Sequence, residues 1–429
     1  MTETFVGPPE PPGPTSPSPA AAGPHTHQHH HHHLQPQEEQ QQQHHHHHHH
    51  NPMHHHQHHL QNSMASSHTS TTESTTTTAA AATPTATANV GGGGAGGERC
   101  SQNTCPQRQA DEPVMLTNDD ATACKRAAVE RGYWKDPYVQ HFIKHGDRKP
   151  PEINRGYFAR VQAIKMLVDK FLEIASSQAQ IVSLGAGFDT LFWRLQDENR
   201  ALKAFVEVDF PPVTMRKVHY IRLRKTLLER IATGEDDDIR LSKCDIHSTR
   251  YHLIGVDMKD METLAAKLAD DCRLDPQLPT LFIAECVLVY MAPSDCEALL
   301  AYISSTFKKA VFLNYDPVNM NDKFAEVMLE NLKHRDCHFL GLEAAQDLAS
   351  QEARLLRCGF ARVRSWLMLQ VYQALPSAEL KRIEALELMD EHELLQQLLN
   401  HYCISVADNC APSLGFGEVR LHPVSTVSV

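Results

Sequence analysis

The chain has 429 residues, a formal net charge of −12 and 11 cysteines, none of them in a CxxC pair. The acidic balance disfavours non-specific binding to nucleic acid or to a membrane surface, and an odd number of scattered cysteines indicates a reducing compartment. No apolar run is long enough to span a bilayer, and no secretory signal opens the chain. We therefore expect a protein of the cytosol, or of both cytosol and nucleus.

Residues 1–112 consist largely of runs of His, Gln, Thr, Ala and Gly, and they contain most of the 30 histidines. Such a composition buries too little apolar surface to offset the entropy of ordering, so we predict a disordered extension whose deletion leaves activity intact. The histidine tracts could bind divalent metals weakly, although a solvated spacer is the favoured interpretation. Cys100 and Cys105 lack a second ligand pair at zinc-site spacing, and we predict no metal centre.

Residues 113–429 are predicted to fold as one domain that opens with a helical cap over 113–178. Asn118 is expected to cap a first helix, which Gly132 can end. A second helix is predicted over Asn154–Ala175, because its apolar residues recur at steps of three and four. These helices precede the first convincing strand, so they are placed to cover it.

From residue 179 to 420 short apolar strands alternate with helical patterns. This alternation predicts a Rossmann-like core, an α/β fold with a doubly wound, mostly parallel sheet and substrate-binding insertions. The expected strands are Gln180–Leu184, Ala204–Val208, Tyr251–Val256, Thr280–Ala284 and Ala310–Asn314, with a last strand-like segment at Tyr402–Val406 after a helix over about 387–401.

A glycine turn, Gly185-Ala186-Gly187, follows the first strand and leads into a helix. Glycine lets the backbone approach a ligand where a side chain would collide. Thr190 stands where a dinucleotide-binding turn has its third glycine, which argues against a pyrophosphate ligand and a nicotinamide oxidoreductase.

Acidic residues end the strands that follow the glycine turn. These are Asp209, Asp257 and Glu285. Ligands of open parallel sheets lie beyond the carboxyl ends of the strands, where an acid can accept hydrogen bonds from ribose hydroxyls, an adenine amino group or an ammonium. S-adenosylmethionine offers all three groups and a sulfonium cation. Glu207 is an alternative on the second strand, but Asp209 sits at the strand's exit, about 20 residues past the turn, as a ribose ligand requires.

Four cations lie on the two predicted cap helices, and they are Lys125, Arg126, Arg155 and Arg160. Arginine can hold a carboxylate through two parallel hydrogen bonds, so these residues are candidates for binding the cofactor's methionine carboxylate and a carboxylate substrate. Solvated surface charge is an equally open interpretation for any one of them.

Several segments resemble the leucine carboxyl methyltransferase family, in order over residues 115–407. They are Cys124–Arg126, Gly132–Trp134, Asp136–Tyr138, Gln140–Phe142, Glu152–Arg160, Leu184–Thr190, Glu207–Pro211, Ile283–Met291 and Arg382–Glu384. The resemblance implies the seven-stranded type of sheet of class I S-adenosylmethionine-dependent methyltransferases. It also implies a monomer that esterifies the C-terminal leucine of protein phosphatase 2A catalytic subunits, through contacts with the subunit's tail and active-site face, and so regulates holoenzyme assembly.

The resemblance further implies a set of cofactor contacts. Arg160 and Lys125 would bind the methionine carboxylate, Asp209 the ribose, and Glu285 would lie by the methionine end. Asp257 with Met258 would contact the adenine, and Gly185 would lie against the cofactor.

The sequence indicates fewer residues for binding the substrate than for binding the cofactor. Arg155, Tyr157 and Tyr290 are candidates for the substrate pocket, although the tyrosines could equally be core aromatics. A C-terminal carboxylate is ionised at neutral pH, so we expect no catalytic base, and Cys286 is interpreted as a buried thiol.

Two alternative functions stay open. One is a tRNA-modifying methyltransferase of the wybutosine pathway, whose catalytic half resembles this family but which carries a long C-terminal repeat domain that we do not find after Tyr402–Val406. The other is a non-catalytic module that binds phosphatase tails.

Overall fold

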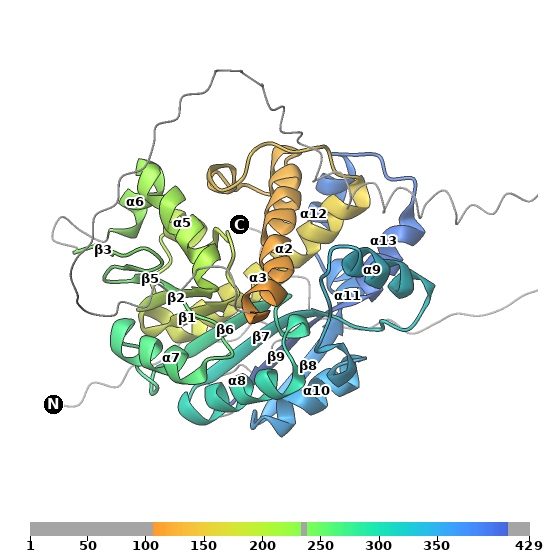
Figure 1. Ribbon diagram of the computed structural model, residues 1–429. Helices are drawn as coiled ribbons and strands as arrows, with labels where there is room; N and C mark the ends of the chain where they lie inside the picture. The colour runs from red at the N-terminus through yellow and green to blue at the C-terminus, as the bar shows by residue number, and fades with distance from the viewer. Residues whose placement is uncertain (1–105, 233–237, 411–429) are drawn as a thin grey trace, which may run out of the picture. The chain divides into compact units, whose positions relative to one another are not determined.

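The computed structural model describes residues 106–232 and 238–410, all within one compact unit of the chain (Figure 1). The predicted disorder of residues 1–105 and the end of the predicted core, 411–420, lie outside these residues. Within the described part, the sheet has nine strands in the order β3-β4-β5-β2-β1-β6-β7-β9-β8. None of the described helices is both long enough and apolar enough to cross a membrane.

The long strands are β1 (Gln180–Leu184), β2 (Ala204–Asp209), β5 (Tyr251–Gly255), β6 (Thr280–Glu285), β7 (Ala310–Pro317), β8 (Arg362–Leu367) and β9 (Tyr402–Asp408). Strands β5, β2, β1, β6 and β7 run parallel, and β9 pairs antiparallel with both β7 and β8. The two-residue strands β3 (Arg240–Leu241) and β4 (Ile246–His247) extend the edge beside β5. The predicted doubly wound, mostly parallel α/β sheet is confirmed.

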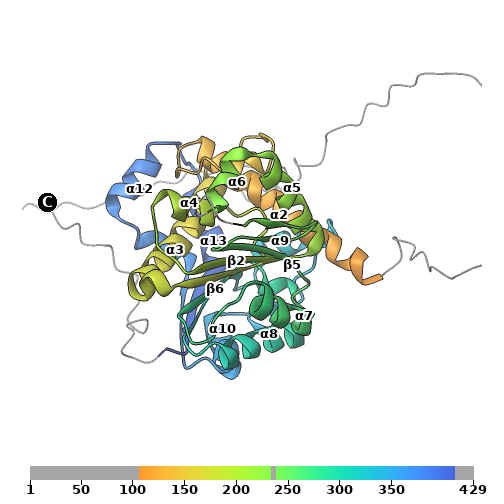
Figure 2. The ribbon, with the colours of Figure 1, turned by 90° about the vertical axis from the view of Figure 1, so that its left-hand side faces the viewer.

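Successive strand residues face two separate hydrophobic cores, as the two-residue period of a strand requires. Ile181 and Phe205 belong to one core, whereas their neighbours Val182 and Val206 belong to the other. Helices cover both faces of the sheet (Figure 2). The first face carries α3 (Pro151–Ala175), α4 (Leu191–Asp197), α5 (Pro211–Leu223), α6 (Lys225–Ile231), α11 (Met368–Gln373) and α13 (His392–Asn400). The second carries α7 (Met261–Ala266), the π-helix η3 (Lys267–Asp271), α8 (Pro293–Thr306) and α10 (Leu348–Arg357).

The two predicted cap helices are α2 (Pro106–Glu130) and α3, and they pack against each other. Gly132, with φ +90°, follows the end of α2 as predicted. The start of α2 was predicted wrongly, because the helix begins at Pro106 and the expected domain boundary at 112 falls inside it. Asn118 therefore lies in mid-helix and is no cap.

Six further helical segments complete the described part. They are η1 (Val139–His141), η2 (Ser176–Gln178), η4 (Leu288–Tyr290), α9 (Lys323–Lys333), η5 (Leu342–Ala344) and α12 (Ser377–Glu384).

Candidate active site

A cavity of about 560 Å³ lies between the carboxyl ends of the parallel strands and the cap helices α2 and α3. The wall also includes the end of α9 and the segment that follows it. All seven predicted cofactor contacts line this one cavity, and they are Lys125, Arg160, Gly185, Asp209, Asp257, Met258 and Glu285. The parallel register brings them together, because strand ends that are far apart in sequence meet at the same edge of the sheet.

The glycine turn after β1 adopts backbone conformations that other residues rarely take. Gly185 has φ +59° and Gly187 has φ +51°. A Cβ on Gly185 would lie 2.6 Å from Cγ2 of Val287, and one on Gly187 would collide with the side chain of Asn118. Both positions therefore require glycine for its conformation and for space.

Asn118 was assigned the wrong role from the sequence. Its Oδ1 accepts a hydrogen bond of 2.8 Å from the backbone N–H of Phe188, so it connects the cap helix α2 to the glycine turn. Sequence reasoning missed this contact because nothing local to Asn118 indicates a partner 70 residues further along the chain.

Asp209 ends β2 with its carboxylate against the same turn. Its Oδ2 accepts from the N–H of Gly187 at 2.6 Å, and its Oδ1 accepts from the N–H of Phe210 at 2.7 Å. Burial raises the pKa of Asp209 to about 6, although these two hydrogen bonds favour the ionised form. The carboxylate is held in place and has acceptor capacity left toward the cavity.

Glu207 has a structural position instead. It is fully buried, 2.6 Å from Nζ of Lys217, and accepts from the Tyr251 hydroxyl at 2.7 Å. It does not line the cavity, so the preference for Asp209 is supported by the geometry.

A cluster of two cations and two carboxylates forms the middle of the site. Nζ of Lys125 lies 2.9 Å from Glu285 and 3.1 Å from Asp189, and Nε of Arg160 lies 2.5 Å from Glu285. Burial acts to raise the pKa of Glu285, but Arg160 and Lys125 outweigh it and hold the pKa below its ordinary value. The carboxylate therefore stays ionised and the cluster is electrically balanced.

Asp189 was not among the predicted site residues. It lies two residues after the glycine turn, and its Oδ1 also accepts from the N–H of Leu191 at 2.6 Å. Burial disfavours its charge, yet Lys125 and Arg194 lower the pKa of Asp189 well below the usual range. An acid two residues past the second glycine was the available signal for this site.

The cavity wall also includes a charge bridge between α2 and the segment after β5. Nζ of Lys259 lies 2.9 Å from Asp111 and 3.5 Å from Asp257. Asp111 was assigned to the disordered extension, so this lining residue was missed. Met258 is buried beside Asp257 and contributes apolar surface.

Two of the predicted cations do not reach the cavity. Arg155 is 3% exposed and donates to the backbone carbonyl of Glu387 at 3.0 Å, and Arg126 binds Glu130 and the carbonyl of Ile143. The expectation that Arg155 lines the substrate pocket is thus corrected. Five positions along a helix correspond to a rotation of about 140°, so Arg155 cannot face the same way as Arg160.

Tyr157 and Tyr290 do line the cavity, beside Cys286. Burial raises the pKa of both tyrosines well above the ordinary value and that of Cys286 to about 12. All three groups are therefore protonated at neutral pH, so the tyrosine hydroxyls can donate hydrogen bonds but none of the three can act as a base. Cys286 is partly exposed to the cavity and not fully buried as predicted, but its raised pKa disfavours the thiolate form that a nucleophile needs.

Comparison with known proteins agrees with the resemblance in the sequence. A model of the leucine carboxyl methyltransferase family matches residues 113–304. Leucine carboxyl methyltransferase 1 from Bos taurus is 45% identical over 325 residues, which are 75% of this chain and 98% of the relative. The Caenorhabditis elegans protein of the same name is 42% identical over 302 residues, 68% of this chain and 90% of the relative.

More distant similarities were also found. The human tRNA wybutosine-synthesizing protein 4 is 34% identical over 320 residues, which are 72% of this chain but 46% of that protein. Among solved structures, the phosphoethanolamine N-methyltransferase 2 of Haemonchus contortus, in complex with S-adenosylhomocysteine, aligns with a TM-score of 0.36 at 13% identity, over 67% of this chain and 60% of that chain.

Proposed function

The chain belongs to the leucine carboxyl methyltransferase family, and from this membership we propose that it methylates the C-terminal leucine of the protein phosphatase 2A catalytic subunit. The donor is S-adenosylmethionine, and the product is a methyl ester on the α-carboxylate. We expect this ester to regulate assembly of the phosphatase holoenzyme. We further expect the enzyme to act as a monomer, in the cytosol or also in the nucleus, and to contact both the tail and the active-site face of its substrate.

One observation carries the proposal: strand-end carboxylates, a glycine turn and two cap-helix cations meet in a single cavity. The residues fit the donor. Lys125 and Arg160 match the methionine carboxylate, Asp209 has acceptor capacity for ribose hydroxyls, and the ionised Glu285 suits a neighbouring ammonium. Gly185 lines the cavity with a left-handed backbone, and any side chain there would collide with Val287.

The chain's own residues have a limited chemical task. The substrate carboxylate, with an ordinary pKa of about 3.5, is already an anion at neutral pH and needs no base. When bound, S-adenosylmethionine supplies an electrophilic methyl group on a cationic sulfur. Tyr157 and Tyr290, both protonated and lining the cavity, can orient the substrate carboxylate by donating hydrogen bonds. Alignment of this kind can contribute about 7–11 kcal/mol to lowering a barrier.

The test is transfer of labelled methyl from S-adenosylmethionine to purified phosphatase catalytic subunit. We expect label on the intact subunit, none on a subunit lacking its C-terminal leucine, and complete release as methanol in mild alkali, as an ester requires. Label that survives alkali, or that appears equally on the truncated subunit, would contradict the proposal. If the chain binds the phosphatase tail without any transfer, it is a non-catalytic module.

A second candidate is tRNA modification, favoured by the 34% identity to the wybutosine-synthesizing protein. The same labelled donor, offered with total tRNA in place of the phosphatase, distinguishes the two. Transfer to tRNA at a rate comparable to that on protein would favour this candidate.

A further inference from the structure

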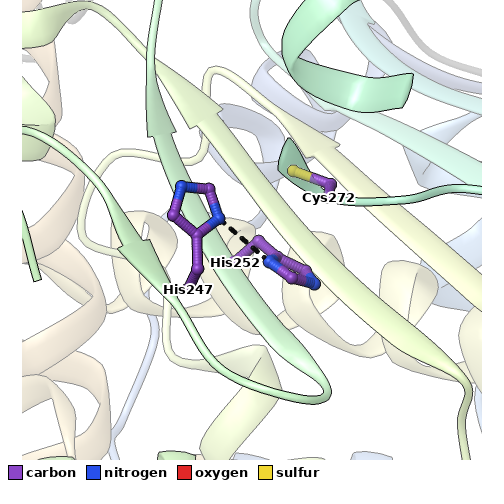
Figure 3. A group of neighbouring side chains, drawn as sticks. All are labelled: His247, His252 and Cys272. Carbon is purple, nitrogen blue, oxygen red and sulfur yellow. Dashed lines mark hydrogen bonds between the residues drawn. The ribbon is translucent and has the colours of Figure 1, made fainter. Parts of the chain in front are cut away.

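A second cluster of chemically capable side chains lies outside the active-site cavity. It consists of His247, His252 and Cys272, which come from β4, β5 and the residue after η3 (Figure 3). None of the three lines the cavity described above. One ring nitrogen from each histidine and the sulfur of Cys272 all lie within 4.8 Å of one another.

The two histidines are held together by strand pairing. His247 and His252 are directly opposite one another in the antiparallel pair β4–β5, so their side chains leave the sheet on the same face. Their Nδ1 atoms are 3.1 Å apart, and the ring centroids 5.3 Å. This face also carries Ile254, and it is the face covered by η3.

The thiol is brought in from that covering element. The N–H of Cys272 bonds to the carbonyl of Lys267 at 3.0 Å, which closes the π-helix and fixes the cysteine at its end. Cys272 is 3% exposed and His252 is 6% exposed, whereas His247 is half-buried. The cluster is thus sheltered but reachable from the side of His247.

We propose that His247, His252 and Cys272 form a binding site for a thiophilic divalent cation, zinc, that connects the β4–β5 edge of the sheet to η3. Imidazole nitrogen and cysteine sulfur are the donors that zinc selects, whereas magnesium and calcium require oxygen. Tetrahedral zinc places its nitrogen ligands about 3.4 Å apart and its nitrogen and sulfur ligands about 3.6 Å apart. The histidine pair, with Nδ1 atoms 3.1 Å apart, is close to that spacing, and a small rotation of the Cys272 side chain toward the pair completes three ligands. Solvent on the His247 side supplies the fourth.

Cobalt titration of the full chain tests this inference, because a cobalt–thiolate bond gives a strong near-ultraviolet absorbance that the histidine tracts before residue 70 cannot produce. We expect one thiolate-bound cobalt per chain, displaced by zinc. His247→Ala and Cys272→Ser should each weaken that binding by at least about tenfold, the scale reached even by loss of a metal's outer-sphere partners. Cys244→Ser, a half-buried cysteine outside the cluster, is the matched control and should bind like the wild type.

No thiolate absorbance in the wild type, or absorbance that persists in both variants, would overturn the assignment and leave an ordinary hydrogen-bonded histidine pair. Should Cys272→Ser fail to fold, His247→Ala still decides, since His247 is half-buried on the two-residue strand β4 near the edge of the sheet. A second readout is thermal melting, which zinc should raise for the wild type and for Cys244→Ser but not for His247→Ala. Methyl transfer should be unaffected in His247→Ala, so this inference and the proposed function fail separately.

Discussion

At the scale of single residues, the site depends on charges that are buried but not equally compensated. Glu285 forms ion pairs with two cations, whereas the hydrogen bonds that Asp209 accepts within the described part of the chain come from backbone N–H groups. Burial therefore dominates at Asp209, where the pKa is raised, but not at Glu285, where it is lowered. The two acids should accordingly respond differently to pH and to loss of their partners.

Asp209 should make the stability of the ligand-free protein depend on pH. Its folded-state pKa of about 6 exceeds the unfolded value of 3.8, so the folded state holds the proton more tightly. Its contribution to the free energy of unfolding is greatest below the unfolded pKa and falls as the pH rises through about 6, by up to about 3 kcal/mol. Urea unfolding between about pH 5 and pH 7.5 should show the free energy of unfolding of the wild type falling relative to that of Asp209→Asn as the pH rises. Asp260→Asn, at an exposed helix cap, is the control and should show no such trend; a constant difference for Asp209→Asn would refute the shift.

Arg160 should control affinity for the donor. Arg160→Met removes a 12% exposed guanidinium that lines the cavity, leaving Glu285 with Lys125 as its cationic partner in the cluster. We expect S-adenosylhomocysteine affinity, measured by calorimetry, to fall about 10- to 100-fold, since hydrogen bonds to charged groups contribute about 1.5–3 kcal/mol. Arg126→Met removes a cation that does not line the cavity and should bind normally. Equal losses in both variants would point to general destabilisation instead.

At the scale of elements, the important contact is the one between the cap helix α2 and the turn after β1. Asn118 on α2 accepts from the N–H of Phe188, and its side chain fills the space that a Cβ on Gly187 would need. The strand β1, the glycine turn and the cap helix α2 therefore hold one another in position. A substitution in the turn should also disturb the packing of α2.

Gly187→Ala should lower the stability of the protein. The left-handed backbone at φ +51° and the collision with Asn118 together should lower the free energy of unfolding by about 1–3 kcal/mol. Gly146→Ala is the matched control, since its Cβ would meet no atom within 4 Å, and it should change stability by less than about 0.5 kcal/mol. Urea unfolding measures the free energy of unfolding of each variant. Similar values for the two variants would show that the turn tolerates a side chain.

At the scale of the whole molecule, the boundary of the folded part matters for function. The cap helix begins at Pro106, and Asp111 on its first turns bridges to Lys259 beside Asp257. Removal of residues 1–112, expected from composition to be harmless, would delete this bridge. Removal of residues 1–105 would keep it.

We therefore expect the two truncations to differ. The chain without 1–105 should keep full activity, because the composition of that segment predicts no binding role. The chain without 1–112 should show a KM for S-adenosylmethionine raised about two- to fivefold, the effect of losing a partly exposed ion pair of up to about 1 kcal/mol. Asp111→Asn in the full chain should reproduce that rise. A large loss of activity on removing 1–105 would contradict the prediction.

Much of the fold was predictable because hydrophobic period and turn chemistry are local. The strand β1 was predicted with its observed bounds, and β2, β5 and β6 to within a residue at each end, since short apolar runs between turns have few alternative conformations. Gly185, Asp209, Asp257 and Glu285 could be placed in one site because parallel strands end at a common edge. The start of α2 could not be predicted, because the polar residues around Asp111 are stabilised in a helix by partners distant in sequence.

The sequence by itself determined the sheet, the glycine turn, the acids at the strand ends and membership in a methyltransferase family. Each of these can be recognised from a short segment of sequence, because its local pattern does not depend on residues far along the chain. Only the tertiary structure decided which charged residues face the cavity. In the structure Arg160 faces the cavity, whereas Arg155 points toward Glu387. Asn118 connects the cap helix to the glycine turn, and Asp111 and Asp189 line the cavity. Folding also brings His247, His252 and Cys272 close together. These outcomes depend on the rotation of helices and the pairing of strands, which follow from packing the described part of the chain around its hydrophobic cores.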